Sequence, residues 1–400
     1  MKITKLEKVK FTIRTKKKLI AGHGSVSGIT IMLIKVFTDE EITGVGEGIA
    51  NPVTEAAFNQ YIEPYVIGKD VHDIELMLND LVSHKNGGLD NAQIIYRAFC
   101  PLEYALWDIM GQAAKQPICK LIGGPVRKEI NFVAEIYYSP GADVKDYVKN
   151  AVAFVKEKGF KMLKLKGGFS AEMDVAVVRE VRKAVGDKIE IILDPNGAWS
   201  LATALRIIDK IAKYDIMWVE NPLPFFDLEG TARLRKILNS NVPIALCEGT
   251  NRIGGIWEII DIVRRGAADV ISIDTRRNGG IYMAKKAAAI AEAAGIPVTV
   301  HSGSGTGLHI AYFLHLLSTI PNLYFGGTAD SLLPYYEDDV ITKPWDFTNG
   351  CLPVPLQPGV GVKLDERKIK KYADQFKKEG YRTKYEWVSE LPQFIPSPRY

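Results

Sequence analysis

Acidic side chains recur at regular intervals along the second half of the chain, each at the end of a short apolar run. Asp194, Glu220, Glu248 and Asp274 follow one another at steps of 26–28 residues, and His301 continues the series. A single Asp in such a place is most often the N-cap of the next helix. Three successive carboxylates would repel one another unless a positive group lay among them, and a hard divalent cation with oxygen ligands meets that need. The spacing therefore predicts a metal site.

Two lysines and a histidine add acid/base chemistry to this series. In Lys164-Leu165-Lys166 the alternation of a strand turns both lysines to one face. Two neighbouring ammonium groups lower each other's pKa, so that one becomes a competent base. Asp274 and His301 end neighbouring units, where an Asp–His pair would fix the imidazole tautomer and raise its basicity. A bare Lys-x-Lys is more often a solvated strand end, but the carboxylates beside it favour the chemical interpretation.

The elements that must position these residues alternate in type from about residue 130. We expect strands over eight short apolar runs: Ile130–Tyr138, Met162–Lys166, Ile189–Asp194, Ile216–Glu220, Pro243–Glu248, Asp269–Asp274, Pro297–His301 and Leu323–Thr328. The amphipathic stretches between them predict helices: Ala142–Lys158, Ala171–Val185, Leu201–Tyr214, Leu228–Leu238, Ile253–Arg264, Gly280–Ala294 and Gly307–Ser318. Eight such units favour a (β/α)8 barrel over an open sheet, with the charged series side by side on its C-terminal rim. The last helical unit is expected to be replaced, because 331–364 is rich in proline and glycine.

The first part of the chain has strands before helices. We expect strands over Lys2–Thr15, Ile29–Phe37 and Ile42–Glu47, then helices over Glu55–Ile62, Asp73–Leu81 and Gln93–Ala114. These patterns predict an α+β domain at 1–125 and a barrel domain at 126–365, with the tail 366–400 packed against the first domain. The run Lys18–Ser25 is predicted to be a flexible loop that closes over the site, with His23 near a distal group of the ligand.

Bulk composition excludes several classes of protein. With 47% hydrophobic and 24% charged residues, the chain can bury a sizeable core. A net charge of +4 is too small for a nucleic-acid surface. No run is long enough to span a bilayer and no signal-peptide core begins the chain, so we expect a cytoplasmic protein with no membrane partner. The four scattered cysteines predict reduced thiols and no zinc site, and the glycines at 44, 46 and 48 lack the spacing of a dinucleotide fingerprint.

These motifs together resemble the enolase superfamily, specifically its mandelate racemase-type subgroup (the mandelate racemase/muconate lactonizing enzyme family). The resemblance covers nearly the whole chain and depends on separate motifs in the right order: Ala105-Leu106-Trp107-Asp108 with Gly111, Pro117 and Leu121-Ile122-Gly123-Gly124; Lys164-x-Lys166; Asp194-Pro195-Asn196-Gly197; Glu220-Asn221-Pro222; Glu248; Asp274 ahead of Asn278-Gly279-Gly280; and His301. It implies an α/β fold, a modified TIM barrel of the (β/α)8 type with an N-terminal α+β capping domain. It also implies a homo-oligomer.

The resemblance implies that Asp194, Glu220 and Glu248 hold one Mg²⁺ ion, or Mn²⁺ in its place. A shift of one residue would put Cys247 at the third ligand position instead. Because Cys is a poor ligand for Mg²⁺, we favour Glu248.

The resemblance also implies the acid/base groups. Lys166 would be the base on one face of the substrate, with Lys164 lowering its pKa and helping to neutralise the substrate carboxylate. His301, oriented by Asp274, would act on the opposite face.

Five further residues are predicted to bind the substrate: His23, Tyr137, Asn196, Ser302 and Asp330. Some members of the subgroup carry a carboxylate at the end of the eighth strand. Here Asp330 comes slightly after the predicted strand, and the hydroxyl of Ser302 is an alternative partner for the substrate. His23 could equally be an exposed loop residue, and Tyr137 a packed core residue.

Within the subgroup, the same first step leads to different products. The reaction we expect is removal of the proton next to a carboxylate, followed by dehydration of a sugar acid, an aldonate or aldarate, to a 2-keto-3-deoxy acid. The alternatives are a racemase or epimerase of a 2-hydroxy or amino acid, and a cycloisomerase. A non-catalytic binding protein on the same fold would show damage at the ligand or base positions, and all of those residues are present.

Overall fold

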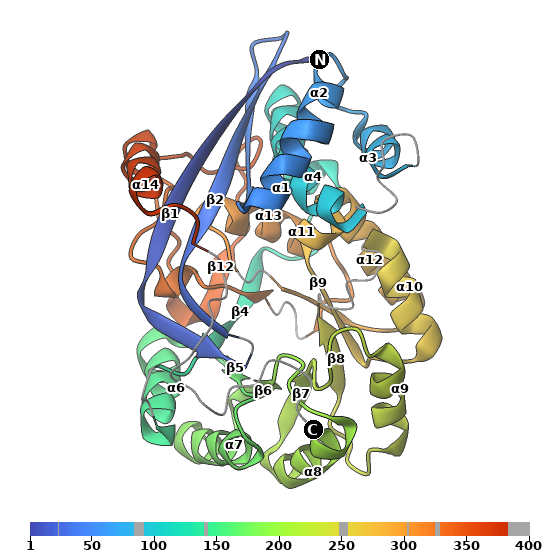
Figure 1. Ribbon diagram of the computed structural model, residues 1–400, viewed down its shortest axis with the longest axis vertical. Coiled ribbons are helices and arrows are strands. Elements are labelled where there is room, and N and C mark those ends of the chain that lie inside the picture. The colour runs from blue at the N-terminus through green and yellow to red at the C-terminus, as the bar shows by residue number, and fades with distance from the viewer. Residues whose placement is uncertain are drawn as a thin grey trace.

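The chain forms two units, a three-stranded antiparallel sheet with helices and a closed barrel of parallel strands (Figure 1). The computed structural model describes residues 1–22, 24–83, 92–139, 143–247, 255–301, 304–324 and 329–382, and of residues 247, 329 and 330 the backbone alone. No helix in these ranges is long and apolar enough to cross a membrane. The core is continuous between the units, because buried side chains of the N-terminal sheet such as Phe11 and Ile13 belong to the same cluster as side chains such as Leu163 and Val177, which pack between the barrel strands and their helices.

The N-terminal sheet has three strands in sequence order: β1 (Ile3–Ala21), β2 (Gly24–Thr38) and β3 (Thr43–Ile49). The prediction of a flexible loop over Lys18–Ser25 was wrong, because this run is the tip of a long hairpin in which Leu19 pairs with Val26 and Ile20 with Ser25. Leu19 and Ile20 are fully buried, so apolar burial holds the tip against the barrel. His23 lies outside the described residues.

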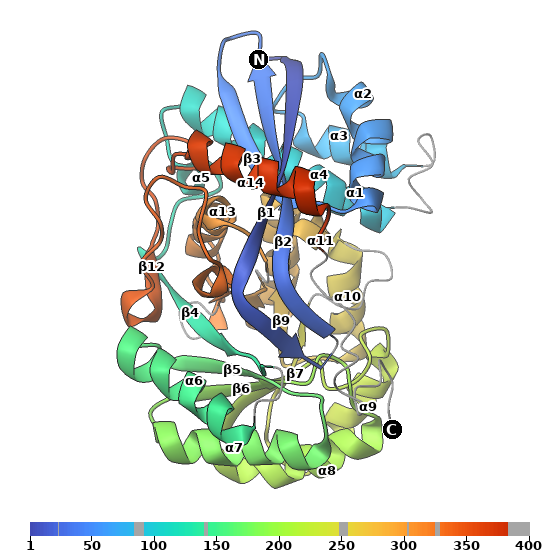
Figure 2. The ribbon, with the colours of Figure 1, turned by 60° about the vertical axis from the view of Figure 1, so that its left-hand side comes forward.

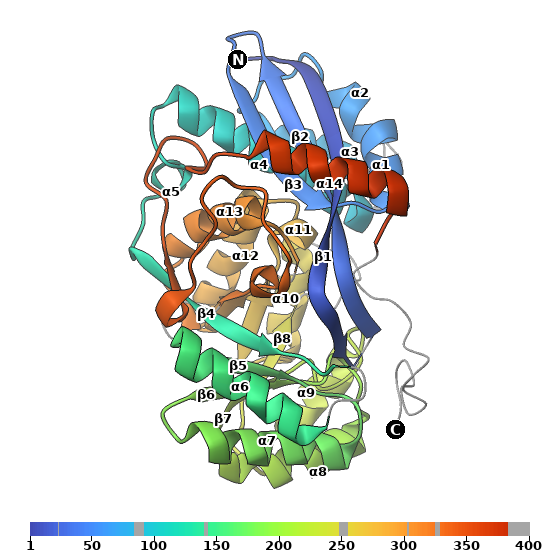
Figure 3. The same ribbon diagram turned by 90° about the vertical axis from the view of Figure 1, so that its left-hand side faces the viewer.

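Helices cover both faces of this sheet. On one face lie α1 (Pro52–Ala57), η1 (Phe58–Ile62), α2 (Glu63–Val66), α3 (Ile74–Val82) and α4 (Ala92–Ala113), followed by α5 (Ile118–Leu121). On the other face α14 (Glu366–Glu379) crosses β1 and β2 (Figures 2 and 3). A Cβ atom at Gly44 or Gly46 of β3 would overlap the carbonyl oxygens of Ala105 or Pro101, so the closely spaced glycines let α4 lie directly on the strand.

Eight parallel strands form the barrel: β4 (Glu129–Ile136), β5 (Met162–Lys166), β6 (Glu190–Asp194), β7 (Ile216–Glu220), β8 (Ile244–Cys247), β9 (Val270–Ile273), β10 (Val298–Val300) and β11 (Ala329–Asp330). Each strand pairs with the next, and β11 pairs with β4, so the sheet closes. A short strand, β12 (Cys351–Pro353), adds to β4 in antiparallel orientation. The predicted fold, a modified TIM barrel with an N-terminal α+β capping domain, is confirmed.

The barrel helices are α6 (Val144–Lys158), α7 (Ala171–Val185), α8 (Leu201–Ile211) continued by η3 (Ala212–Tyr214), α9 (Leu228–Ile237), α10 (Gly255–Arg265), α11 (Thr275–Asn278), α12 (Ile281–Ala293) and α13 (Gly307–Ser318). Ser170, Ser200 and Asp227 accept hydrogen bonds from the first turns of α7, α8 and α9, which explains why these helices begin where the sequence predicts. The single turn α11, directly after β9, was not predicted.

The last barrel unit departs from the others. Of the predicted strand Leu323–Thr328, Leu323 forms a parallel bridge with Val298 of β10, and residues 325–328 lie outside the described residues. Pairing with β4 is made by Ala329 and Asp330, beyond the predicted end. Asp330 therefore lies in the strand and not after it. Between 331 and 364 the structure has no α-helix but two 3₁₀ turns, η5 (Leu333–Tyr335) and η6 (Thr348–Gly350), as the proline and glycine content predicts.

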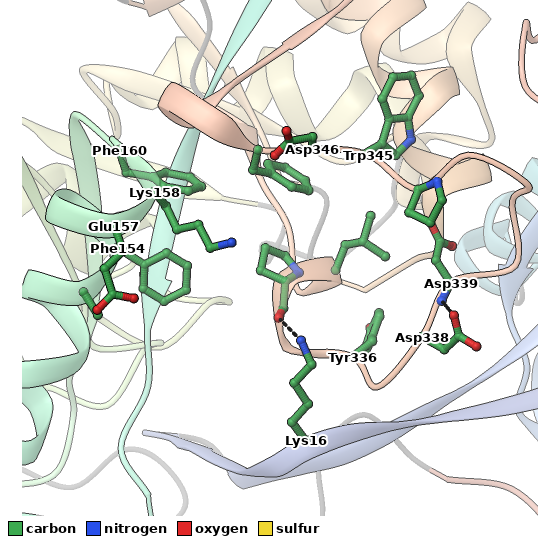
Figure 4. Close-up of a pocket in the computed structure, with 15 residues that line it drawn as sticks. Lys16, Phe154, Glu157, Lys158, Phe160, Tyr336, Asp338, Asp339, Trp345 and Asp346 are labelled. Atoms are coloured by element: carbon green, nitrogen blue, oxygen red, sulfur yellow. Dashed lines mark hydrogen bonds between the residues drawn. The ribbon is translucent and has the colours of Figure 1, made fainter.

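A cavity of about 430 Å³ lies beside this irregular segment, between it and α6 (Figure 4). Aromatic rings from both sides, including Phe154 and Trp345, line it. Lys16 of β1 reaches into it and donates to the carbonyl oxygen of Pro334 at 3.2 Å. Among the described residues, none of those predicted for the active site lines this cavity.

Candidate active site

Buried charged residues gather at the carboxyl ends of consecutive barrel strands. Lys164 and Lys166 lie on β5, Asp194 ends β6 and Glu220 ends β7. In the register of β5 and β6, Lys166 lies opposite Asp194. Exposure is 4% or less for all four residues. The rim that they occupy is where active sites of parallel barrels are found.

Two buried ion pairs join these residues. Lys164 Nζ lies 2.9 Å from Glu220 Oε1, and Lys166 Nζ lies 2.8 Å from Asp194 Oδ2. An unpaired buried carboxylate costs several kcal/mol, and a nearby ammonium group offsets that cost. The lysines therefore supply positive charge among the carboxylates, and a divalent cation would compete with them for the same oxygen atoms.

The turn after β6 holds Asp194 in place, and a neighbour on β7 holds Glu220. Asn196 and Asn221 have positive φ angles of 52° and 46°, a conformation that Asn tolerates better than most residues. Asn196 donates from its backbone N–H and its side-chain amide to Asp194, at 2.9 and 3.0 Å. Its own Oδ1 is buried and accepts no hydrogen bond within the described ranges. Glu220 accepts at Oε2 from Trp218 Nε1 at 3.3 Å.

The donor set fits a hard cation as far as it is described. Asp194 and Glu220 offer oxygen atoms, which Mg²⁺ prefers, on neighbouring strands. The third predicted ligand, Glu248, lies outside the described residues, as does the side chain of Cys247. Within the described residues, no group of three His, Cys, Asp or Glu side chains could hold a metal ion. The described part of the rim therefore offers two candidate oxygen ligands, and all three ligand assignments stay predictions.

A second charged group lies at the ends of β9 and β10. Asp274 Oδ2 lies 3.2 Å from Nδ1 of His301, and both side chains are buried. Burial alone would raise the pKa of Asp274, but the charge of Arg276 and the hydrogen bond from His301 hold it well below its usual range. Asp274 is therefore an ionised partner for the imidazole, and we call this pair the dyad.

The two groups face each other across the barrel. In the closed sheet, β5 and β9 are separated by three strands in either direction, so Lys166 and the dyad lie on opposite sides of the interior. Asp194 and Glu220 lie on the strands that follow β5 on the way to β9. A small molecule bound at the rim would have an amine on one side, an imidazole on the other and two carboxylates between them.

Sequence reasoning missed one carboxylate of this site. Glu135 on β4 is 2% exposed, and its Oε1 lies 3.0 Å from Lys166 Nζ. The ring of Tyr137, two residues on and on the same face of the strand, lies 5.6 Å from the same ammonium group. A signal was present, because strand alternation places Glu135 and Tyr137 on one face. Lys166 is therefore held between Glu135 and Asp194.

The remaining predicted substrate-binding residues are less completely described. His23 and Ser302 lie outside the described residues, and only the backbone of Asp330 is described. The hairpin tip does reach the rim, since a Cβ atom at Gly22 would lie 2.7 Å from Gly167 O and 2.9 Å from Pro195 O. A glycine is needed for this close approach to the turns that follow β5 and β6.

Comparison with known proteins agrees with this architecture. The family model described as mandelate racemase / muconate lactonizing enzyme, N-terminal domain, matches residues 8–123, and the one described as enolase C-terminal domain-like matches residues 146–368. The N-succinyl-L-Arg/Lys racemase of Bacillus cereus is 29% identical, over 92% of this chain and 96% of the relative. The arabinonate dehydratase of Saccharolobus solfataricus is 28% identical, over 86% and 90%.

A solved structure extends the likeness to three dimensions. The crystal structure of an enolase from Thermobispora bispora, complexed with magnesium and formate, matches with a TM-score of 0.85 and 26% identity over 96% of this chain and 95% of that one. The predicted resemblance is confirmed, since the two family models together span both units of the fold. The chain belongs to the enolase superfamily, in its mandelate racemase subgroup.

Proposed function

We propose that this protein is a Mg²⁺-dependent dehydratase of a sugar acid, an aldonate or aldarate, that releases a 2-keto-3-deoxy acid. The observation that carries the proposal is the placement of Lys166 and the dyad on opposite sides of the barrel interior. Dehydration needs one group to take the α-proton and a second to protonate the leaving hydroxyl, and these two groups supply both.

Asp194, Glu220 and Glu248 would hold the metal. The related enolase from Thermobispora bispora is complexed with magnesium and formate, a small carboxylate, which supports the choice of Mg²⁺ and of a carboxylate substrate. A bound Mg²⁺ would supply fixed positive charge for the substrate carboxylate, where negative charge builds as the α-proton leaves. Lys164 would add a second positive charge on the same side.

The proton transfers follow from the positions of the side chains. Lys166 Nζ would take the α-proton, held in place by Glu135 when Asp194 turns to the metal. His301 Nδ1 faces Asp274, so in the imidazolium form Nε2 would give its proton to the β-hydroxyl and leave the neutral imidazole with its proton on Nδ1. The C–O bond then breaks, water leaves, and the resulting enol becomes the 2-keto-3-deoxy acid by taking up a proton at C3 and releasing one from the C2 oxygen.

Racemisation or epimerisation is the second candidate. The same opposed pair of amine and imidazole could remove a proton from one face and return one to the other. The relative from Bacillus cereus, a racemase, is 29% identical to this chain, and this similarity supports racemisation as the second candidate reaction. It differs from dehydration in needing no leaving group at the β-carbon.

The deciding experiment is a panel of aldonates and aldarates with Mg²⁺, scored for a 2-keto-3-deoxy product. We expect one acid to be turned over, with activity lost on chelation and in Lys166→Ala but kept in Lys161→Ala, an exposed lysine just before the same strand. A blank across the panel, with α-proton exchange into D₂O still seen on some acid, would replace dehydration by racemisation or epimerisation.

A further inference from the structure

Arg276 is a buried cation next to the dyad that the proposed reaction does not use directly. It lies on α11, two residues after Asp274, and is 7% exposed. Its Nε and Nη2 each donate to Asp274, to Oδ1 and Oδ2, both at 3.1 Å. Its Nη1 donates to the carbonyl oxygen of Ser304, three residues after His301. One guanidinium group thus joins the turn after β9 to the segment after β10.

We propose that Arg276 is a positioning residue that assembles the dyad by holding Asp274 and the segment after His301 on a single planar group. The role assigned to the dyad rests on the proposed function, but the geometric claim stands on these contacts alone.

The planar set of N–H donors on the Arg276 guanidinium group, which we call the fork, fixes the orientation of the Asp274 carboxylate. A guanidinium group that binds both oxygen atoms of a carboxylate fixes the plane of that carboxylate. Asp274 Oδ2 then faces His301 Nδ1 at 3.2 Å. The carboxylate cannot rotate away without breaking the two hydrogen bonds from the guanidinium group and a third from the backbone N–H of Arg276 at 2.9 Å. Arg277 also approaches Oδ2, but from 3.5 Å, with a side chain that is 23% exposed. Arg277 therefore serves as a matched control.

The capping domain supports both ends of this bridge. Tyr104 of α4 lies within hydrogen-bond distance of Thr275, between Asp274 and Arg276, with 2.6 Å between the two hydroxyl oxygens. Glu47 of β3 accepts from the backbone N–H of Thr306 at 2.7 Å and from its hydroxyl, two residues after Ser304. The capping domain thus contacts the segment that follows Asp274 and the segment that follows His301. Among the described residues, the titratable groups on other elements that lie close enough to interact with the charge of Arg276 include Glu47, Cys100, Tyr104 and Tyr336.

The test reads His301 directly and needs no substrate. The full chain is labelled with ¹⁵N-histidine, and its six histidines are followed by NMR across pH, with His301→Asn to assign the signal. In the wild type we expect one neutral tautomer with the proton on Nδ1, facing Asp274. In Arg276→Met we expect the titration midpoint of His301 to rise by about one pH unit or more, because the charge of Asp274 is no longer shared with the fork. Arg277→Met should stay close to the wild type.

Two further variants keep the test decisive if Arg276→Met does not fold. Arg276→Lys keeps a positive charge and loses the fork, so we expect a mixture of His301 tautomers. In Arg276→Ala, added methylguanidinium should return the His301 signal towards the wild type, and methylammonium should not. The proposal would be overturned if folded Arg276→Met or Arg276→Lys gave wild-type His301 signals. It would also be overturned if Arg277→Met changed those signals as much as Arg276→Met does. Failure of the sugar-acid panel would leave these results untouched.

Discussion

Buried carboxylates occur in two regions of this molecule, and their partners differ. At the rim, Asp194, Glu220 and Asp274 face the ammonium and guanidinium groups of lysine and arginine side chains. At the junction between capping domain and barrel, the carboxylates face neutral N–H and O–H donors, most of them backbone amides. The residues of this second set are Glu47, Glu103 and Asp108. Both sets are almost completely buried, so burial alone does not distinguish them.

Two of the junction carboxylates, Glu47 and Glu103, accept hydrogen bonds where barrel helices begin. Glu103 of α4 accepts from the backbone N–H groups of Ile281 and Tyr282, at 2.9 and 2.8 Å, where α12 begins. Burial raises the pKa of Glu103 to about 7, against the hydrogen bonds that lower it. Burial raises the pKa of Glu47 also to about 7 and that of Asp108 to about 6.

The two regions differ in whether a buried carboxylate can exchange its partner for another. A carboxylate balanced by a lysine side chain can trade that partner for another cation, because the side chain can move. A carboxylate bound to backbone amides has no partner that can move without distorting the local backbone, such as the start of a helix at Glu47 and Glu103. The rim is therefore suited to a metal and a substrate, and the junction to holding two domains together. Substitutions in the two regions should therefore differ in their effects on metal binding, stability and pH dependence.

The largest effect should come from removing a rim carboxylate. In Asp194→Asn we expect Mg²⁺ affinity to fall by about 100-fold or more, because a ligand oxygen with full charge becomes a neutral amide. Turnover on the substrate found in the panel should fall by about 10³-fold. Isothermal titration with Mg²⁺ measures the first quantity. Asp209→Asn, on the exposed face of α8, is the control and should bind Mg²⁺ as the wild type does; equal loss in both variants would remove Asp194 from the metal site.

Removing the lysine partner should leave a buried carboxylate charge uncompensated and so lower the stability of the protein. In Lys164→Met, Glu220 loses the ammonium group at 2.9 Å, and we expect the metal-free protein to lose about 3–5 kcal/mol of stability. Added Mg²⁺ should recover part of the loss, since a bound cation stabilises the folded state. Urea unfolding with and without Mg²⁺ measures both.

The double variant Lys164→Met/Glu220→Gln provides the control, because it removes both charges together. It should be more stable than Lys164→Met without metal and should gain less from Mg²⁺. A Lys164→Met protein as stable as the wild type would contradict the view that the lysine compensates a buried charge.

The junction should respond to pH in the opposite sense from an ordinary ionised carboxylate. Because burial raises the pKa of Glu103 from its ordinary 4.5 to about 7, the folded chain binds the proton more tightly than the unfolded chain. Its contribution to stability is full below about pH 4.5 and is lost as pH rises through about 7, a change of up to about 3 kcal/mol.

Glu103→Gln is the variant that tests this pH dependence. It should be less stable than the wild type at pH 5, because an amide cannot accept all three hydrogen bonds that Glu103 accepts. The gap should narrow towards pH 8, where the wild type carries a buried charge. Denaturant unfolding at several pH values measures the gap, and a gap independent of pH would rule out Glu103 as the titrating group.

The contrast also explains how much of the molecule could be predicted from sequence. Short apolar runs ended by a charged residue predicted β5 and β7 to the residue, because local alternation and a polar strand end specify them. The same ends placed the rim residues side by side. The extension of the eighth strand to Ala329 and Asp330 was missed because it depends on closure against β4, a contact between segments far apart in the chain.

The partners of the rim residues depend on tertiary structure even more. Glu135 lies on a strand that was predicted, yet its value as a partner of Lys166 appears only when β4 and β5 are paired. Arg276 lies within two residues of a predicted site residue, and its bridge to Ser304 requires β9 and β10 to be neighbours. Spacing finds residues at equivalent positions in repeated units; it does not find contacts across them.

The smallest effect should come from an ion pair that is partly exposed at the surface. Lys368 of α14 lies 2.7 Å from Asp338, and both side chains are more than a quarter exposed. Water screens such a pair, so we expect Lys368→Met to lose less than about 1 kcal/mol of stability, and 0.5 M salt, about the concentration at which screening acts over a few ångströms, to remove most of the difference. Urea unfolding at low and high salt provides the measurement. A loss as large as that of Lys164→Met, or one insensitive to salt, would mean that exposure does not separate the surface pair from the rim pairs, and the contrast drawn between buried partners would lose its physical basis.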